Sequence, residues 1–219
     1  MNFPFTIQQF LNVFKNYNET VFPVQAVFYL LAIIIIYFIF KEIRGRDKII
    51  NSILSLYWIW IGIVYNFIFF STINKAAYIF GSLFILQGLL FLYFGTIKNK
   101  ISYDFTKTGV NYLGLIFILY ALIIYPILGR LLGHQYPYSP TFGLPCPTTI
   151  FTFGVLLFVN KKIGMLLLII PLLWSLIGFN AAVSLSIYED FGLLIAGVIG
   201  FITLLISNKR YSANSIGAM

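Results

Sequence analysis

The sequence predicts an all-α integral membrane protein with seven transmembrane helices, an N-terminal interfacial helix and a re-entrant loop. Three observations lead to this fold class: charges are scarce, apolar runs are long enough to cross a bilayer, and basic residues alternate with those runs. Of the 219 residues, 60% are hydrophobic and 9% are charged, whereas a soluble domain carries about 25% charged residues. Such a chain cannot cover a water-facing surface, and we expect one membrane domain over residues 1–219.

The seven predicted spans are apolar runs separated by short polar segments. A helix of about 20 residues crosses the roughly 30 Å of hydrocarbon in a bilayer. Backbone polar groups in lipid must be paired within the protein, and the runs lack the alternating pattern of a membrane barrel, so helices are predicted. The predicted spans cover residues 21–40, 49–70, 76–96, 110–128, 148–160, 163–182 and 191–206.

Residues 1–20 predict a short amphipathic helix. No basic segment precedes an unbroken apolar core, so the segment does not resemble a signal peptide. Apolar side chains recur at helical spacing between Phe3 and Phe14, with glutamine, asparagine and lysine among them. Such a helix can lie in the membrane interface. Packing of the same apolar face against the helical bundle is an equally good interpretation.

The positions of the basic residues predict the orientation of the chain. With seven spans, 11 of the 14 lysine and arginine residues fall on one side of the membrane. The positive-inside rule then places the N-terminus outside and the C-terminus in the cytoplasm. Because this pattern accounts for the net charge of +8, we expect no nucleic-acid partner. The eleven residues are Lys41, Arg44, Arg46, Lys48, Lys98, Lys100, Lys107, Lys161, Lys162, Lys209 and Arg210.

Small residues recur on one face of three predicted spans. Such faces allow helix backbones to approach closely in lipid, so helix contacts are expected there. A proline at position 171 is also expected to kink the sixth span. The faces consist of Gly81, Gly88 and Gly95; Pro171, Trp174, Gly178 and Ala181; and Gly192, Ala196 and Gly200.

The segment from Gly133 to Gly154 is the anomalous part of the chain. It contains the single histidine, His134, and the single cysteine, Cys146. Its last residues belong to the predicted fifth span, which has only 13 residues. A helix of that length extends about 20 Å, which is too short to cross a bilayer. Residues 129–147 are therefore predicted to form a re-entrant loop, which must be buried in protein or line a wet cavity.

The start of the fifth span suggests a binding site. Pro147 suits a first helical turn, since it has no N–H to leave unpaired. Thr148 and Thr149 can offer hydroxyls to the unpaired N–H groups there. Cys146 then stands at the positive end of the helix dipole.

Other polar residues are predicted at the same outer level of the bundle and favour a pocket between helices. The ligand-binding candidates are His134, Cys146, Thr148, Thr149, Tyr65, Asn66, Tyr125, Arg130 and Asn180. The metal-ligand candidates are His134, Cys146, Glu19, Glu189 and Asp190.

Three functions fit these residues. A small-ligand or metal-ion binding protein, such as a transporter or a transport accessory, would use thiolate, imidazole and carboxylate groups that suit zinc or copper. A membrane-embedded enzyme would use Cys146 as nucleophile and His134 as base, beside the helix N-terminus. A structural or assembly subunit would need no ligand. The partners expected are the lipid bilayer and a small molecule or metal ion.

Several chemistries lack their residues. The chain has no phosphate-binding P-loop and no dinucleotide fingerprint. One cysteine excludes an intramolecular disulfide and a CxxC redox pair, and one histidine excludes a bis-histidine haem. No lysine lies in the middle of the seventh span, so a retinal Schiff base is not expected.

The motif GHQYPYSPTFGLPCPTTIFTFG, residues 133–154, resembles the signature of a family of bacterial multi-pass membrane proteins catalogued as a domain of unknown function. The resemblance extends to residues 14–18, to residues 171–174 and to an aromatic pattern in the second span. That pattern consists of Tyr57, Trp60, Gly62, Tyr65, Phe69 and Phe70. The resemblance implies a multi-pass protein of the bacterial plasma membrane and no particular activity.

The orientation is testable with a topology reporter. A reporter fused after Asn208 should be active on the cytoplasmic side, because most basic residues lie on that side of the predicted spans. Activity of the same fusion on the outer side would contradict the orientation.

Overall fold

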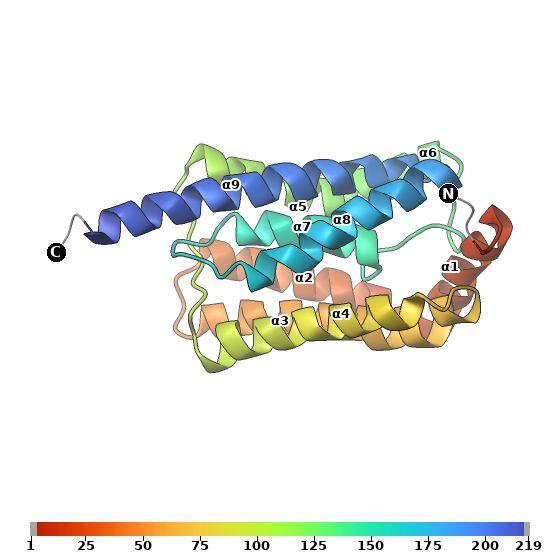
Figure 1. Cartoon of the computed structure of the whole chain (residues 1–219), viewed down its shortest axis with the longest axis horizontal. Helices are drawn as coiled ribbons and strands as arrows, with labels where there is room; N and C mark the ends of the chain where they lie inside the picture. The colour runs from red at the N-terminus through yellow and green to blue at the C-terminus, as the bar shows by residue number, and fades with distance from the viewer. Residues whose placement is uncertain (1–3, 217–219) are drawn as a thin grey trace.

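The computed structural model describes residues 4–216 and shows a bundle of helices along one long axis (Figure 1). Apart from isolated β-bridges, the regular structure in these residues is helical, so the predicted all-α class is confirmed. The consecutive helices run back and forth along the bundle. The elements are α1 (Ile7–Val21), α2 (Val24–Phe40), α3 (Arg46–Trp60), η1 (Ile61–Phe69), η2 (Phe70–Thr72), α4 (Ala77–Leu90), η3 (Phe91–Ile97), α5 (Gly109–Leu119), η4 (Tyr120–Ile124), α6 (Tyr125–Leu131), α7 (Pro145–Leu156), α8 (Leu166–Leu185), η5 (Tyr188–Asp190) and α9 (Phe191–Ile216).

Five helical stretches in the described residues are long and apolar enough to cross a membrane. They are Arg46–Thr72, Ala77–Ile97, Gly109–Leu131, Leu166–Leu185 and Tyr188–Ser212. A sixth span results if α1 and α2, which meet at 82°, count as one bent helix. The remaining predicted span is α7, which has only 12 residues. By length alone the structure therefore supports five or six spans, and the count of seven stays a prediction.

The exterior of the bundle is apolar. Large aliphatic side chains point outward along the spans, and Ile33, Ile79 and Ile123 each expose half or more of their surface. Large exposed apolar surfaces are not tolerated in water. This surface, together with the long apolar helices, identifies a membrane protein.

Helix α1 packs across one end of the bundle, against η1 and α2 (Figure 1). Its N-terminus carries a capping box, in which Thr6 and Gln9 exchange side-chain and backbone hydrogen bonds. Its apolar face is buried, with Val13, Phe14 and Tyr17 in the core. Packing on the bundle is thus observed, and a position in the membrane interface remains a prediction. We call this end of the bundle the α1 end.

The short helix α7 lies in the middle of the bundle (Figure 1) and packs against α5, α8 and α9. Eleven of its 12 residues are buried. Gly114 of α5 and Gly154 of α7 bring the two backbones together: a Cβ built on either glycine would lie within 3.0 Å of the other's carbonyl oxygen. A helix that is apolar on all sides is stable only when it is enclosed in this way.

The predicted break before the fifth span is confirmed, although α7 begins at Pro145, two residues before the predicted Pro147. Residues 132–144 form no helix, and Gly143 has a φ of +100°, which favours glycine. This loop covers the start of α7 at the α1 end.

A second loop, residues 98–108, covers the other end of α7. The backbone N–H of Asp104 donates to the carbonyl of Phe158, and that of Asn160 donates to the carbonyl of Ser102. The side chain of Asn111 donates to the carbonyl of Leu157 at 3.0 Å. The carbonyls of Leu157 and Phe158, just past the end of α7, are thereby paired inside the protein, as a helix end buried in a bundle requires.

The predicted helix contacts of the small residues are present. A Cβ on Gly81, Gly88 or Gly95 would lie within 3.0 Å of side chains or backbone of the helix formed by α3 and η1. On α9, Gly192 lies against Tyr120 and Gly200 against Phe153. These close approaches are the usual means by which apolar helices associate in lipid.

Pro171 lies inside α8 and has no N–H to donate to the carbonyl of Leu167. The side-chain amide of Gln87, from α4, donates to that carbonyl at 3.0 Å. Gln87 is completely buried. The glutamine on α4 therefore replaces the hydrogen bond that the proline on α8 removes.

This pairing predicts a coupling between two positions. Gln87→Leu leaves the Leu167 carbonyl unpaired and should cost about 1–3 kcal/mol of folding stability. In a Pro171→Ala background the new N–H at position 171 can donate to that carbonyl, so the same change should cost about 1 kcal/mol less. Thermal unfolding of the four proteins in detergent measures both values. Strictly additive effects would contradict the exchange of hydrogen bonds.

Candidate functional site

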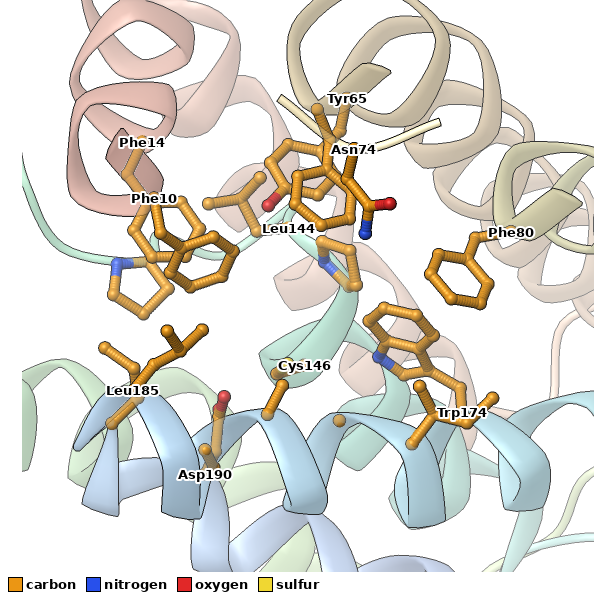
Figure 2. A pocket seen from close by; sticks show the side chains of 18 of the residues that line it. Phe10, Phe14, Tyr65, Asn74, Phe80, Leu144, Cys146, Trp174, Leu185 and Asp190 are labelled. Atoms are coloured by element: carbon orange, nitrogen blue, oxygen red, sulfur yellow. The ribbon is translucent and has the colours of Figure 1, made fainter. Parts of the chain in front are cut away.

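A cavity of about 100 Å³ lies at the α1 end, between α1, α8 and the start of α7 (Figure 2). Its walls are mostly aromatic and aliphatic and include Phe10 and Phe14 of α1, Phe80 of α4 and Leu185 of α8. A single water needs roughly 10–15 Å³ in the same measure, so the cavity is large enough for a small organic group. We call this space the thiol cavity, after the cysteine in its wall.

Polar groups gather on one side of the thiol cavity. Cys146, in the first turn of α7, lies beside the carboxylate of Asp190 (Figure 2). The indole N–H of Trp174 is buried and faces the Cys146 sulfur, a weak acceptor, and it donates to no oxygen or nitrogen among residues 4–216. Tyr125 donates its hydroxyl hydrogen to Asp190. A buried N–H donor and a partly used carboxylate thus meet on one side of the cavity, with the Asn74 amide on the other side and apolar walls between them (Figure 2).

The short turn η5 positions two consecutive carboxylates. Helix α8 ends at Ser186 in the left-handed conformation, with a φ of +60°. The N–H of Ile187 then donates to the carbonyl of Ala182, and that of Asp190 donates to the carbonyl of Ile187. Both Glu189 and Asp190 are buried by this turn.

Glu189 holds the loop that precedes α7. Its two carboxylate oxygens lie 3.0 and 3.2 Å from Nδ1 of His134. The Glu189 side chain is fully buried against Gly129, where a Cβ would lie 3.1 Å from Oε1. The backbone N–H of His134 also donates to the carbonyl of Gly129. The single histidine is therefore tied to Glu189.

Asn18 of α1 joins the same loop from the other side. Its side-chain amide donates to the carbonyls of Pro137 and Ser139, at 2.7 and 2.9 Å. Its side-chain oxygen accepts the hydroxyl hydrogen of Thr141 at 2.7 Å. Gln25 of α2 donates to the backbone carbonyl of Asn18 at 3.0 Å. One buried asparagine thus fixes the loop that closes the thiol cavity near Pro140 and Leu144.

The π-helical segment η1 brings Tyr65 to the cavity wall. The Tyr65 ring stacks on Phe70 at 5.7 Å and on Phe14 at 6.3 Å between ring centroids. Single π turns within helices often occur at functional sites. Here the altered register lets Tyr65 join the second span to α1 at the edge of the cavity.

The structure brings some predicted ligand-binding residues together and separates others. Cys146 and Tyr65 line the thiol cavity, and Tyr125 reaches it through Asp190. Thr148 and Thr149 are buried and bond to the backbone of Gly143 and Pro145.

Other candidates do not line the thiol cavity. Asn66 is buried and donates to the carbonyl of Ile61. Asn180 is exposed, and Arg130 and His134 line a different cavity.

The five predicted metal ligands do not converge. Glu19 is exposed on α1, His134 is paired with Glu189, and Asp190 faces Cys146. Within residues 4–216, no group of three or more histidine, cysteine, aspartate or glutamate side chains is arranged to hold a metal ion.

Two parts of the site were not predicted from the sequence. Trp174 was interpreted as a helix contact on the face with Gly178 and Ala181, yet all three line the thiol cavity. The contribution of α1 through Phe10 and Phe14 was also missed. The amphipathic pattern of α1 and the small residues of α8 were the available signals.

Residues 7–215 match the model of a family described as Family of unknown function (DUF6064). The chain belongs to this family. No curated protein and no solved structure matches it. The match covers α1, the loop before α7 and both carboxylates of η5, so every lining residue of the thiol cavity except Phe5 lies within it.

The polar side of the thiol cavity predicts that two substitutions differ in their effect on folding stability. Asp190→Ala leaves the buried Tyr125 hydroxyl without its acceptor and should cost about 1–3 kcal/mol of stability. Cys146→Ser should leave stability nearly unchanged, because the new hydroxyl can donate to Asp190. Thermal unfolding in detergent measures both. A Cys146→Ser protein as unstable as Asp190→Ala would show that the thiol belongs to a packed core.

Proposed function

We propose that this chain is a multi-pass protein of the bacterial plasma membrane that binds a small, mainly apolar molecule in the thiol cavity. The observation that carries the proposal is a mainly apolar cavity in whose wall a buried Trp174 N–H, which meets only the Cys146 sulfur, lies near the Asp190 carboxylate. Ligand sites are typically apolar spaces with a few polar groups that fix orientation. With the N-terminus outside, the cavity would lie in the outer half of the membrane.

The polar groups favour a ligand with a hydroxyl group. An alcohol can donate its hydrogen to the Asp190 carboxylate and accept a hydrogen from the Trp174 indole. Its apolar part would then lie against Phe10, Phe14 and Phe80. An unpaired buried donor costs free energy, so pairing it contributes to binding. Binding of this kind suits a transporter or a transport accessory.

A Cys146–His134 enzyme has less support. A nucleophile and its base must lie within hydrogen-bond reach. In this structure Nδ1 of His134 bonds to Glu189, and the histidine lines the other cavity.

The single cysteine allows a direct test in lipid nanodiscs. Cys146 should react with methyl methanethiosulfonate, a small thiol reagent, and 1-octanol should slow the reaction more than n-octane does. The alcohol is favoured because only it can pair with Asp190 and Trp174. Ala181→Phe places a large side chain in the cavity and should suppress both the labelling of Cys146 and its protection by octanol.

Val183→Phe is the matched control, because Val183 lies on the same helix and faces outward. In this variant Cys146 should react with the reagent, and octanol should protect it, as in the wild type. Equal protection by octane and octanol would refute the polar anchor. Labelling of Ala181→Phe at the wild-type rate would refute the cavity as a ligand site.

A further inference from the structure

A second cavity of about 500 Å³ lies at the α1 end, between the start of α2, helix α6 and the loop before α7. It is larger and more open than the thiol cavity. Its lining includes Gln25, Tyr29, Arg130, His134 and Ser139. We call it the arginine cavity.

Two nitrogen-bearing side chains of the arginine cavity are available to an anion. Arg130 is exposed and forms no ion pair with any residue in the described range 4–216. His134 donates from Nδ1 to Glu189, which leaves Nε2 for a ligand, and Nε2 donates to an anion when the ring is protonated. Arginine presents several N–H groups in a fixed geometry that matches phosphate oxygens.

A buried acceptor completes the site. Gln25 exposes 8% of its surface, and its amide nitrogen is bonded to Asn18. Its side-chain oxygen is buried without a partner within residues 4–216. A buried acceptor is normally paired, so a ligand in this cavity should bring a hydrogen-bond donor.

Exposed apolar side chains lie at the cavity: Phe22 and Tyr136 line it, and Leu131 follows Arg130 at the end of α6. Phe22 is 69% exposed, Leu131 76% and Tyr136 56%. They lie at the corner between α1 and α2, at the end of α6 and in the following loop. A ligand with a polar head and a long apolar chain could place its head in the cavity and its chain along this surface.

We infer that the arginine cavity binds the glycerophosphate headgroup of a membrane lipid. The phosphate would contact Arg130 and Nε2 of His134, and a headgroup hydroxyl would donate to the free oxygen of Gln25. This inference is independent of the ligand proposed for the thiol cavity. It concerns other residues, and it does not depend on Cys146.

Binding can be measured by thermal stabilisation of the purified chain in detergent. Dioctanoyl phosphatidylglycerol, which carries phosphate and hydroxyls, should bind the wild type more tightly than dioctanoyl phosphatidylcholine, which has no donor. Arg130→Gln should weaken phosphatidylglycerol binding about tenfold, as expected when a hydrogen bond to a charged group is lost. Lys75→Gln, an equal change of charge in the turn before α4, is the matched control and should bind as the wild type does.

The outcomes separate the possibilities. Equal binding of the two lipids, or equal loss in Arg130→Gln and Lys75→Gln, would overturn the inference. Stabilisation by soluble sn-glycerol 3-phosphate as strong as that by phosphatidylglycerol would support the phosphate site but assign it to a soluble ester. Because Arg130 is exposed and unpaired, Arg130→Gln should keep the wild-type melting temperature without lipid, which shows that its effect on binding is not misfolding.

Discussion

The rest of the structure depends on one constraint: a helix too short to cross the membrane lies in the centre of the bundle. The 12 residues of α7 extend about 18 Å, so both helix ends fall inside the protein. Backbone groups at such ends must find partners within the protein. Residues 98–108 form hydrogen bonds with the backbone just past the end of α7. The loop before Pro145 covers the start of α7. The close contact of Gly114 and Gly154 and the burial of eleven of the 12 residues of α7 follow from this position.

The loop that covers the start of α7 at the α1 end forms a wall of both cavities. Asn18 holds the loop from the side of α1, and Glu189 holds it through His134. The next residue, Asp190, faces the thiol cavity and binds Tyr125. One turn, η5, therefore uses consecutive carboxylates for two purposes: the first fixes the loop, and the second lines a site. Loss of either contact should affect both cavities, because they share the loop as a wall.

Much of the architecture was predictable, because hydrophobic runs and small-residue faces are local patterns. The break before α7 followed from its prolines and its length, and the Gly81, Gly88 and Gly95 face packs as expected. The site was only partly predictable. Cys146 was identified from its position in the chain, whereas its neighbour Trp174 could not be distinguished from a helix contact. The bond between His134 and Glu189 joins residues 55 positions apart, and the turn of η5 that makes it possible has no sequence signal. The aromatic wall contributed by α1 depends on its 82° bend from α2.

The central claim is that the start of α7 opens on an enclosed cavity lined by Cys146, Trp174 and Asp190. An electron cryo-microscopy structure of the chain in a lipid nanodisc, with an antibody fragment bound to add mass, would test it most directly. The account predicts that the Cys146 side chain points into a cavity beside Asp190, with α1 closing the opposite wall and density for an elongated molecule inside. A map in which α1 detaches from the bundle and Cys146 packs against another helix, with no space beside Asp190, would contradict it.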